Sequence, residues 1–144
     1  MLATVTTIPA DKLTHILCVS IDTTPDLIAA VRQGLPCAVF TTLQESLGAS
    51  AATLAQLIGL PVRTLHHRKR QGRFKPNESD NLVRIARVLS RVLEFFEDKE
   101  EALYWLKTPA SALDNTTPLS LLDTEVGAQE VLRLLGQLEH GVFP

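Results

Sequence analysis

The sequence has few cysteines and no long apolar run, and these two absences exclude several classes of protein. Its two cysteines, Cys18 and Cys37, lie in apolar surroundings without a CxxC spacing, which argues against a disulfide framework and a zinc site. No apolar run approaches the roughly 18 residues of a membrane-spanning helix, and the N-terminus lacks the charged flank and apolar run of a signal peptide. We therefore expect a cytoplasmic protein with reduced thiols and no membrane partner.

Motifs of catalysis are missing as well. The chain has no glycine-rich phosphate loop, no nucleophile elbow and no carboxylate pair in an apolar setting that would shift a pKa usefully. The adjacent His66 and His67 point about 100° apart on a helix, so they cannot hold one metal ion together, and no neighbouring cysteine or carboxylate completes a set. We expect a protein that is not an enzyme and that uses neither a metal nor a cofactor.

Charge is distributed unevenly along the 144 residues, although the formal net charge is only −2. Between Pro61 and Lys75 there are six basic residues and no acidic one, whereas from Glu94 to Pro144 ten acidic residues outnumber three basic ones. This asymmetry indicates one surface for a polyanion and another for a different partner, or alternatively two solvated faces of one domain. The length allows one compact unit or two closely packed ones.

The stretch from Ser50 to Arg70 has the residue spacing of a helix-turn-helix. Ala55 is small enough to let two helices cross closely, Gly59 can take the positive φ of a tight turn, and Leu65 supplies an apolar contact. Helix caps and apolar periodicity predict the helices of the chain, which span about Pro25–Gln33, Phe40–Leu47, Ala51–Ile58, Pro61–Gln71, Ser79–Glu97, Lys99–Lys107 and Glu125–His140.

The predicted elements make an all-α protein whose two halves pack through the long helix at 79–97. Residues 1–24 are expected to form a poorly defined arm, because their β-branched residues disfavour a stable helix. Residues 25–78 would form the DNA-binding region and residues 98–144 a second domain. In the helix that begins at Pro25, the spacing of Leu27, Ile28 and Val31 predicts an apolar stripe.

Positions early in the second helix of such a motif meet base edges. In this chain they are Arg63, Thr64, His66, His67 and Arg70. We assign phosphate contacts to Lys69, Arg73 and Lys75, and also to the amide and hydroxyl of Ser50. The alternative is a helical hairpin whose basic face is solvated or binds protein.

Several other arginines are not assigned to DNA. Arg68 occupies a place where many such motifs bury an apolar residue, so the helix is expected to pack only through its first two turns. Arg84, Arg87 and Arg91 recur at successive turns of the long helix, which is more typical of a solvated face than of phosphate binding.

From Leu27 to Pro144 the sequence resembles the Xre-type antitoxins of RES/Xre toxin–antitoxin modules, which carry the MbcA/ParS/Xre toxin-binding domain. The resemblance is carried by GLPCAVFTTLQESLG, by LIGLPVRTLHHRKRQGRFKPNESDNLVRIARVL and above all by ALYWLKTPASALDNTTPLSLLDTEVGAQEVLRLLGQLEHGVF. The residues that match the framework of the toxin-binding domain are Trp105, Pro109, Pro118, Leu121, Leu122, Asp123, Thr124 and Gly127. The chain departs from the family at Asn81, where Arg is usual, and at Asn115, where Gly is usual.

The resemblance implies an antitoxin with a Cro/Xre-like helix-turn-helix bundle joined by a long helix to a small helical C-terminal toxin-binding domain. Such a protein would form a homodimer, bind a RES-domain toxin that destroys NAD by covering its active-site entrance, and repress its own operon by binding operator DNA. The residues that match the terminal segment expected at the toxin cleft are Glu139, His140, Gly141, Val142 and Phe143. The rival interpretation is a free-standing transcription factor whose C-terminal domain only dimerises it.

Overall fold

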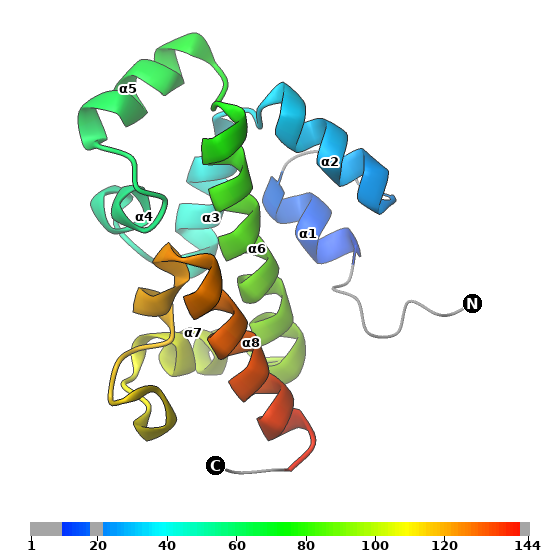
Figure 1. The fold of residues 1–144 in the computed structure, drawn as a ribbon, viewed down its shortest axis with the longest axis vertical. Coiled ribbons are helices and arrows are strands. Elements are labelled where there is room, and N and C mark those ends of the chain that lie inside the picture. Colours follow the sequence, from blue (N-terminus) through cyan, green and yellow to red (C-terminus); the bar gives the residue numbers. More distant parts are fainter. Residues whose placement is uncertain (1–9, 18–21, 142–144) are drawn as a thin grey trace.

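The computed structural model describes residues 10–17 and 22–141, and this part of the chain is helical (Figure 1). Its α-helices are α1 (Ala10–Leu17), α2 (Thr24–Gln33), α3 (Ala38–Leu47), α4 (Ala51–Leu57), α5 (Val62–Gln71), α6 (Pro76–Phe96), α7 (Lys99–Lys107) and α8 (Glu125–Glu139). Two short 3₁₀ helices, Ser111–Leu113 and Leu119–Asp123, lie between α7 and α8. The predicted all-α fold is confirmed, and no helix in the described ranges is long and apolar enough to cross a membrane.

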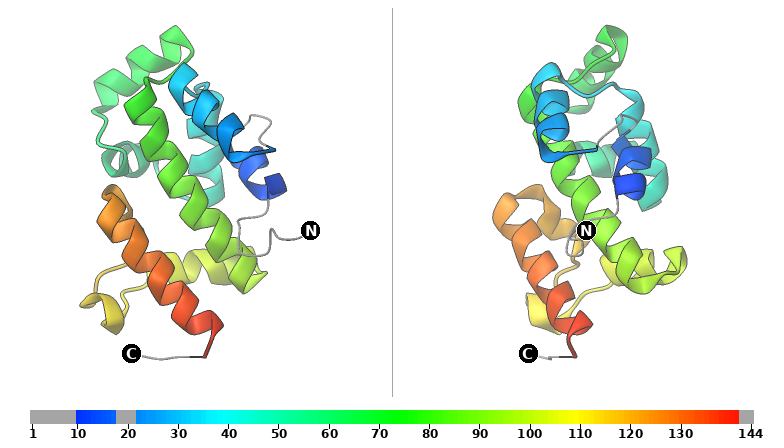
Figure 2. Two further views of the ribbon diagram at one scale, coloured as in Figure 1. Left: turned by 45° about the vertical axis from the view of Figure 1, so that its right-hand side comes forward. Right: turned by 90° about the vertical axis from the view of Figure 1, so that its right-hand side faces the viewer.

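Helix α6 is the axis of the molecule. Helices α1, α2 and α3 pack against it, and α7 and α8 pack along its C-terminal half (Figures 1 and 2). The helix begins at Pro76 rather than at the predicted Ser79, because Pro suits the first turn of a helix and Glu78 accepts a hydrogen bond from the backbone N–H of Lys75 at 2.8 Å. The predicted polar connection before α6 is therefore shorter, and it contains the buried side chain of Phe74.

The prediction of an arm at the N-terminus is wrong for residues 10–17. These residues form α1, whose side chains Leu13, Ile16 and Leu17 are buried against α3 and α6. The three leucine and isoleucine positions lie on one helical face, and burial of that face outweighs the weak helix propensity of the surrounding β-branched residues. The rest of the predicted arm, including Cys18, lies outside the described residues.

Helix α2 is at the predicted place, but its apolar stripe is only partly covered. No residue of α2 is fully buried, and Ile28 is 45% exposed. The helix lies on the outside of α6, so only one edge of the stripe meets the core (Figure 2). Thr23 rather than Thr24 caps it, and the Thr23 hydroxyl oxygen accepts a hydrogen bond from the N–H of Asp26 at 3.2 Å.

The C-terminal half closes on α6 through a tight approach between α8 and the preceding 3₁₀ helix. The hydroxyl oxygen of Thr124 caps α8 by accepting a hydrogen bond from the N–H of Gly127 at 2.9 Å. A Cβ atom at Gly127 would lie 2.0 Å from the backbone oxygen of Leu121. Asn115 takes a φ of 62° in the preceding loop, as expected of a residue that tolerates the left-handed region.

We predict that Gly127→Ala destabilises the protein by about 1–3 kcal/mol, because a backbone oxygen cannot move aside as a flexible side chain could. Gly136→Ala is the matched control in the same helix, since a Cβ there meets nothing within 4 Å, and it should raise stability by up to about 1 kcal/mol. Urea unfolding followed by circular dichroism measures both. Equal effects of the two substitutions would contradict the close approach.

Candidate functional site

Helices α4 and α5 form a helix-turn-helix with the geometry that the sequence predicts. The hydroxyl oxygen of Ser50 caps α4 by accepting a hydrogen bond from the N–H of Thr53 at 3.1 Å. Gly59 takes a φ of 69° in the turn, and the N–H of Leu60 donates to the oxygen of Ala55 at 2.8 Å. Ala55 and Leu65 are buried where the two helices meet, so they fix the crossing of α5 over α4.

Helix α5 lies at one end of the molecule, beyond the N-terminal end of α6 (Figure 1). Most of the predicted base-reading side chains are exposed along it, namely Arg63, His66, His67 and Arg70, whereas Thr64 is half-buried. The predicted phosphate contacts Lys69 and Lys75 are also exposed.

Besides Ser50, whose hydroxyl bonds to Thr53, two of the predicted phosphate-binding residues already have side-chain partners within the protein. Arg73 donates a hydrogen bond from Nη1 to the backbone oxygen of Gly34 at 2.7 Å. The ammonium group of Lys69 lies 5.6 Å from the ring centroid of the buried Phe40, which is the arrangement of a cation–π contact. Both residues remain exposed overall, so these contacts orient the side chains without removing them from the surface.

The expectation that α5 packs only through its first two turns is wrong. Arg68 is 7% exposed and forms a two-point ion pair with Glu78 of α6, with Nε–Oε1 and Nη2–Oε2 distances of 2.8 and 3.0 Å. The pair holds the last turn of α5 against the first turn of α6. It also removes Arg68 from the basic surface, because a paired and buried guanidinium is not available to a phosphate.

The ion pair also sets the protonation of Glu78. Burial alone would raise the pKa of this carboxyl, but hydrogen bonds from Arg68 and from the N–H of Lys75, together with the charge of Arg68, outweigh burial and lower the pKa below its ordinary value. Glu78 has no role among the residues predicted from the sequence. Its position two residues after Pro76 is the available signal, because an acidic residue there marks a helix N-terminus.

The expected solvated face of α6 is also wrong at two of its three arginines. Arg84 donates from Nε to the backbone oxygen of Leu122 at 3.1 Å and from Nη1 to Oδ1 of Asn81 at 3.0 Å. Asn81 in turn donates from Nδ2 to the backbone oxygen of Ile58, at the end of α4, at 3.1 Å. These bonds join the C-terminal half to the helix-turn-helix. Of the three arginines, Arg87 is exposed and the other two are half-buried.

Arg91, the remaining arginine of this face, holds the end of α8. Its Nη2 lies 2.7 Å from Oε1 of Glu139, and its Nη1 lies 2.8 Å from Oε1 of Glu94. Glu139 is one of the residues predicted to meet a partner, and in the isolated chain it is therefore anchored to α6. His140 and Gly141 are exposed after it, whereas Val142 and Phe143 lie outside the described residues.

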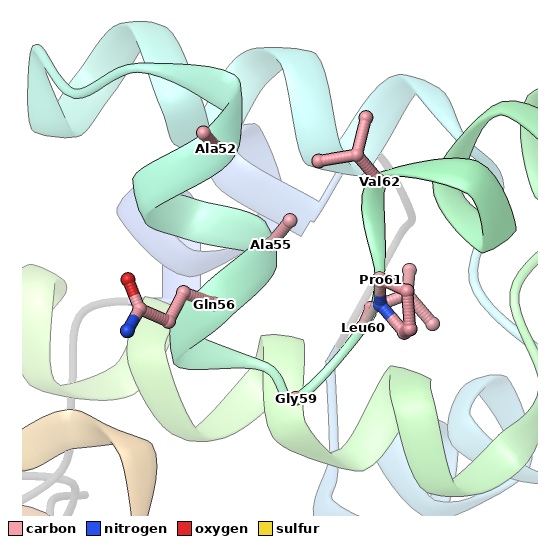
Figure 3. A pocket seen from close by; sticks show the side chains of 7 residues that line it. All are labelled: Ala52, Ala55, Gln56, Gly59, Leu60, Pro61 and Val62. Atoms are coloured by element: carbon pink, nitrogen blue, oxygen red, sulfur yellow. The ribbon is translucent and has the colours of Figure 1, made fainter.

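A shallow groove separates α4 from the start of α5 (Figure 3). Its volume is about 370 Å³, and its lining is largely apolar, consisting of Ala52, Ala55, Gln56, Gly59, Leu60, Pro61 and Val62. Among the described residues, no group of three or more His, Cys, Asp or Glu side chains is arranged to hold a metal ion.

Comparisons with known proteins match both halves of the chain. Residues 26–87 match the antitoxin Xre-like helix-turn-helix domain, and residues 82–141 match the antitoxin Xre/MbcA/ParS C-terminal toxin-binding domain. A protein of Yersinia enterocolitica named "Antitoxin Xre" is 37% identical over 119 residues, covering 81% of this chain and 80% of the relative. A protein of the same name from Photorhabdus laumondii is 33% identical over 120 residues, covering 82% and 81%. A Sphingobium protein named "Prs ADP-ribosylating antitoxin" is 21% identical over 128 residues, covering 82% and 80%.

We predict that the Arg68–Glu78 pair stabilises the fold above the ordinary glutamate pKa of 4.5 and loses this effect as the pH falls. The unfolded chain takes up the Glu78 proton near that pH and the folded chain only at lower pH, so protonation favours unfolding. Glu78→Gln should therefore lower the melting temperature by about 5 °C or more at pH 7, and by much less at pH 3. Thermal unfolding at both pH values measures the difference.

The matched control for this pair is Glu130→Gln, which breaks the exposed Glu130–Arg133 pair on α8. Water screens an exposed pair, so this substitution should change the melting temperature little at either pH. A Glu78→Gln effect that is the same at pH 7 and pH 3 would contradict the role given to the ionised carboxylate.

Proposed function

Because this chain belongs to the family of Xre antitoxins, we propose that it neutralises a RES-domain, NAD-degrading toxin and represses its own operon by binding DNA. Neutralisation is steric: the antitoxin covers the entrance of the toxin's active site and performs no chemistry. The protein acts in the cytoplasm as a homodimer. Its helix-turn-helix domain and its toxin-binding domain carry the two activities.

The DNA-binding role is supported by the charge and exposure of α5. The sequence has no acidic residue between Glu45 and Glu78, so nothing in the motif repels a phosphate. Arg63, His66 and His67 are exposed in the first turns of α5, where such helices meet base edges. We assign base contacts also to Thr64 and Arg70, and phosphate contacts to Ser50, Lys69, Arg73 and Lys75.

The toxin-binding role is assigned to the end of α8. Glu139, His140 and Gly141 are exposed there, and we extend the contact surface to Val142 and Phe143. The part of the chain from Glu94 to Pro144 is strongly acidic. Its negative charge favours a partner whose active site binds the phosphates of NAD with positive charge. The name of the Sphingobium relative contains "ADP-ribosylating", and a toxin related to ADP-ribosyltransferases is the partner we propose here.

The observation that carries the proposal is the separation of the two surfaces. Helix α5 lies at one end of the long axis, and the end of α8 lies at the other end (Figure 1). A toxin held at the end of α8 therefore leaves α5 free for DNA, and the antitoxin can serve both partners at once. We divide the chain into a DNA-binding region at 25–78, the connecting helix at 79–97 and the toxin-binding domain at 98–144.

For the DNA-binding role, we predict that Arg63→Ala weakens operator binding about tenfold or more and relaxes sequence preference, because a bidentate arginine contact discriminates between bases. Lys69→Ala should weaken binding to all sequences alike and reduce its salt dependence, since a phosphate contact releases counterions. Fluorescence anisotropy with operator and scrambled duplexes over a salt series measures both. Arg133→Ala on α8 is the control and should bind as the unaltered protein does; unchanged affinity in all three would refute the assignment of α5.

For the toxin-binding role, we predict that the chain co-purifies with a RES-domain protein encoded beside it and prevents that protein from degrading NAD. Removal of Val142–Pro144 should restore NAD degradation while operator binding remains, because the lost segment is the part placed at the cleft. A larger deletion that begins within α8 separates the alternatives: if it alone abolishes neutralisation, the last three residues do not cover the cleft. Failure to bind any RES-domain protein would favour the free-standing transcription factor.

A further inference from the structure

The first residue of α5 is an apolar side chain on the surface. Val62 is 46% exposed, whereas Leu65 in the next turn of the same helix is 1% exposed. A β-branched residue is a weak helix former, and a side chain left half in water gains little from the core. Burial in the core therefore gives little reason for valine at this position.

Val62 stands at the edge of the groove between α4 and α5. Figure 3 shows the side chains of Val62 and Ala55 pointing toward one another across this groove. Apart from Gln56, the residues that line the groove are apolar or glycine. Arg63 is the next residue of the helix and is exposed. An apolar side chain and a guanidinium group therefore follow one another at the start of α5.

We propose that Val62 and this groove receive the 5-methyl group of a thymine in the major groove of DNA, next to the base that Arg63 contacts. This inference rests on the proposed DNA-binding role of α5. The methyl group of thymine is the apolar group that base edges present in the major groove, and alanine- or threonine-type methyl groups are its usual partners. Val62 is thus a specificity-determining residue that selects thymine over cytosine at one position of each half-site.

The charges around the groove favour DNA as the occupant. Arg63, His66 and Arg70 are exposed on the helix that Val62 begins. No acidic residue stands between Glu45 and Glu78 in the sequence, and Glu78 itself is paired with Arg68. A thymine-containing duplex presents both phosphates and a methyl group in its major groove. The phosphates suit the basic side chains, and the methyl group suits the apolar groove.

The test uses duplexes that the full-length chain enriches from a randomised library. Each enriched thymine is replaced in turn by deoxyuridine, which lacks only the methyl group, and dissociation constants are measured by fluorescence anisotropy at one salt concentration. For the unaltered protein, one position per half-site should weaken binding about fourfold when the methyl group is removed, the factor expected for burying one methyl group. Val62→Ala should bind the thymine duplex about fourfold more weakly and should not respond to deoxyuridine at that position.

Val126→Ala is the matched control, because Val126 is also an exposed valine in the first turn of a helix, α8, and is 77% exposed. It should respond to deoxyuridine as the unaltered protein does. The inference is overturned if no thymine methyl group matters or if Val62→Ala keeps the full response. It is also overturned if Val62→Ala impairs self-association or toxin binding and leaves DNA binding unchanged. If the unaltered chain enriches no duplex, the proposed DNA-binding function itself fails, which is a distinct result.

Discussion

Helix α6 buries side chains around most of its circumference, and this forces the two halves of the chain to share one core. Leu82, Ile85 and Leu89 are fully buried, and so are Ala86 and Val92, together with the nearly buried Val83 and Val88. One continuous cluster joins these residues to α1 and α3 at one end and to α7 and α8 at the other. A helix whose buried side chains occupy so wide a sector must be covered by several neighbouring helices. The helix-turn-helix domain and the toxin-binding domain are consequently packed on one core, and the two surfaces proposed for partners lie at opposite ends of the molecule.

The arginines fall into two groups, those that form contacts within the protein and those that are exposed on the surface proposed for DNA. Arg68 pairs with Glu78, and Arg84 and Arg91 bind groups of the C-terminal half. A buried or half-buried cation needs such partners, because its loss of hydration is otherwise uncompensated. The arginines of α5 that lack these internal partners, Arg63 and Arg70, project from one face, which concentrates the positive charge on the surface proposed for DNA.

The two halves of the chain are also joined by a short series of hydrogen bonds. It runs from the backbone oxygen of Leu122 through Arg84 and Asn81 to the backbone oxygen of Ile58, at the end of α4. The amide of Asn81 spans both sides by donating to the backbone oxygen of Ile58 and accepting from Arg84. The end of α4 is therefore held in place by contacts with the C-terminal half of the chain as well as by α6.

Local patterns in the sequence predicted the helix-turn-helix and every α-helix from α2 to α8, but not α1. The caps at Ser50 and Thr124 and the turn at Gly59 act between residues close in the chain, and the resemblance over the last forty residues indicated the family. Only the tertiary structure decided which polar side chains form hydrogen bonds and ion pairs within the protein. The Arg68–Glu78 pair, the contacts of Arg84 and Arg91 and the burial of α1 depend on elements that meet in space, and periodicity says which face of a helix is apolar but not what covers it. For the same reason, only the structure shows that Ile28 and Val62 are exposed. The sequence alone cannot distinguish a buried apolar residue of a helix from an exposed one, because burial depends on neighbouring elements.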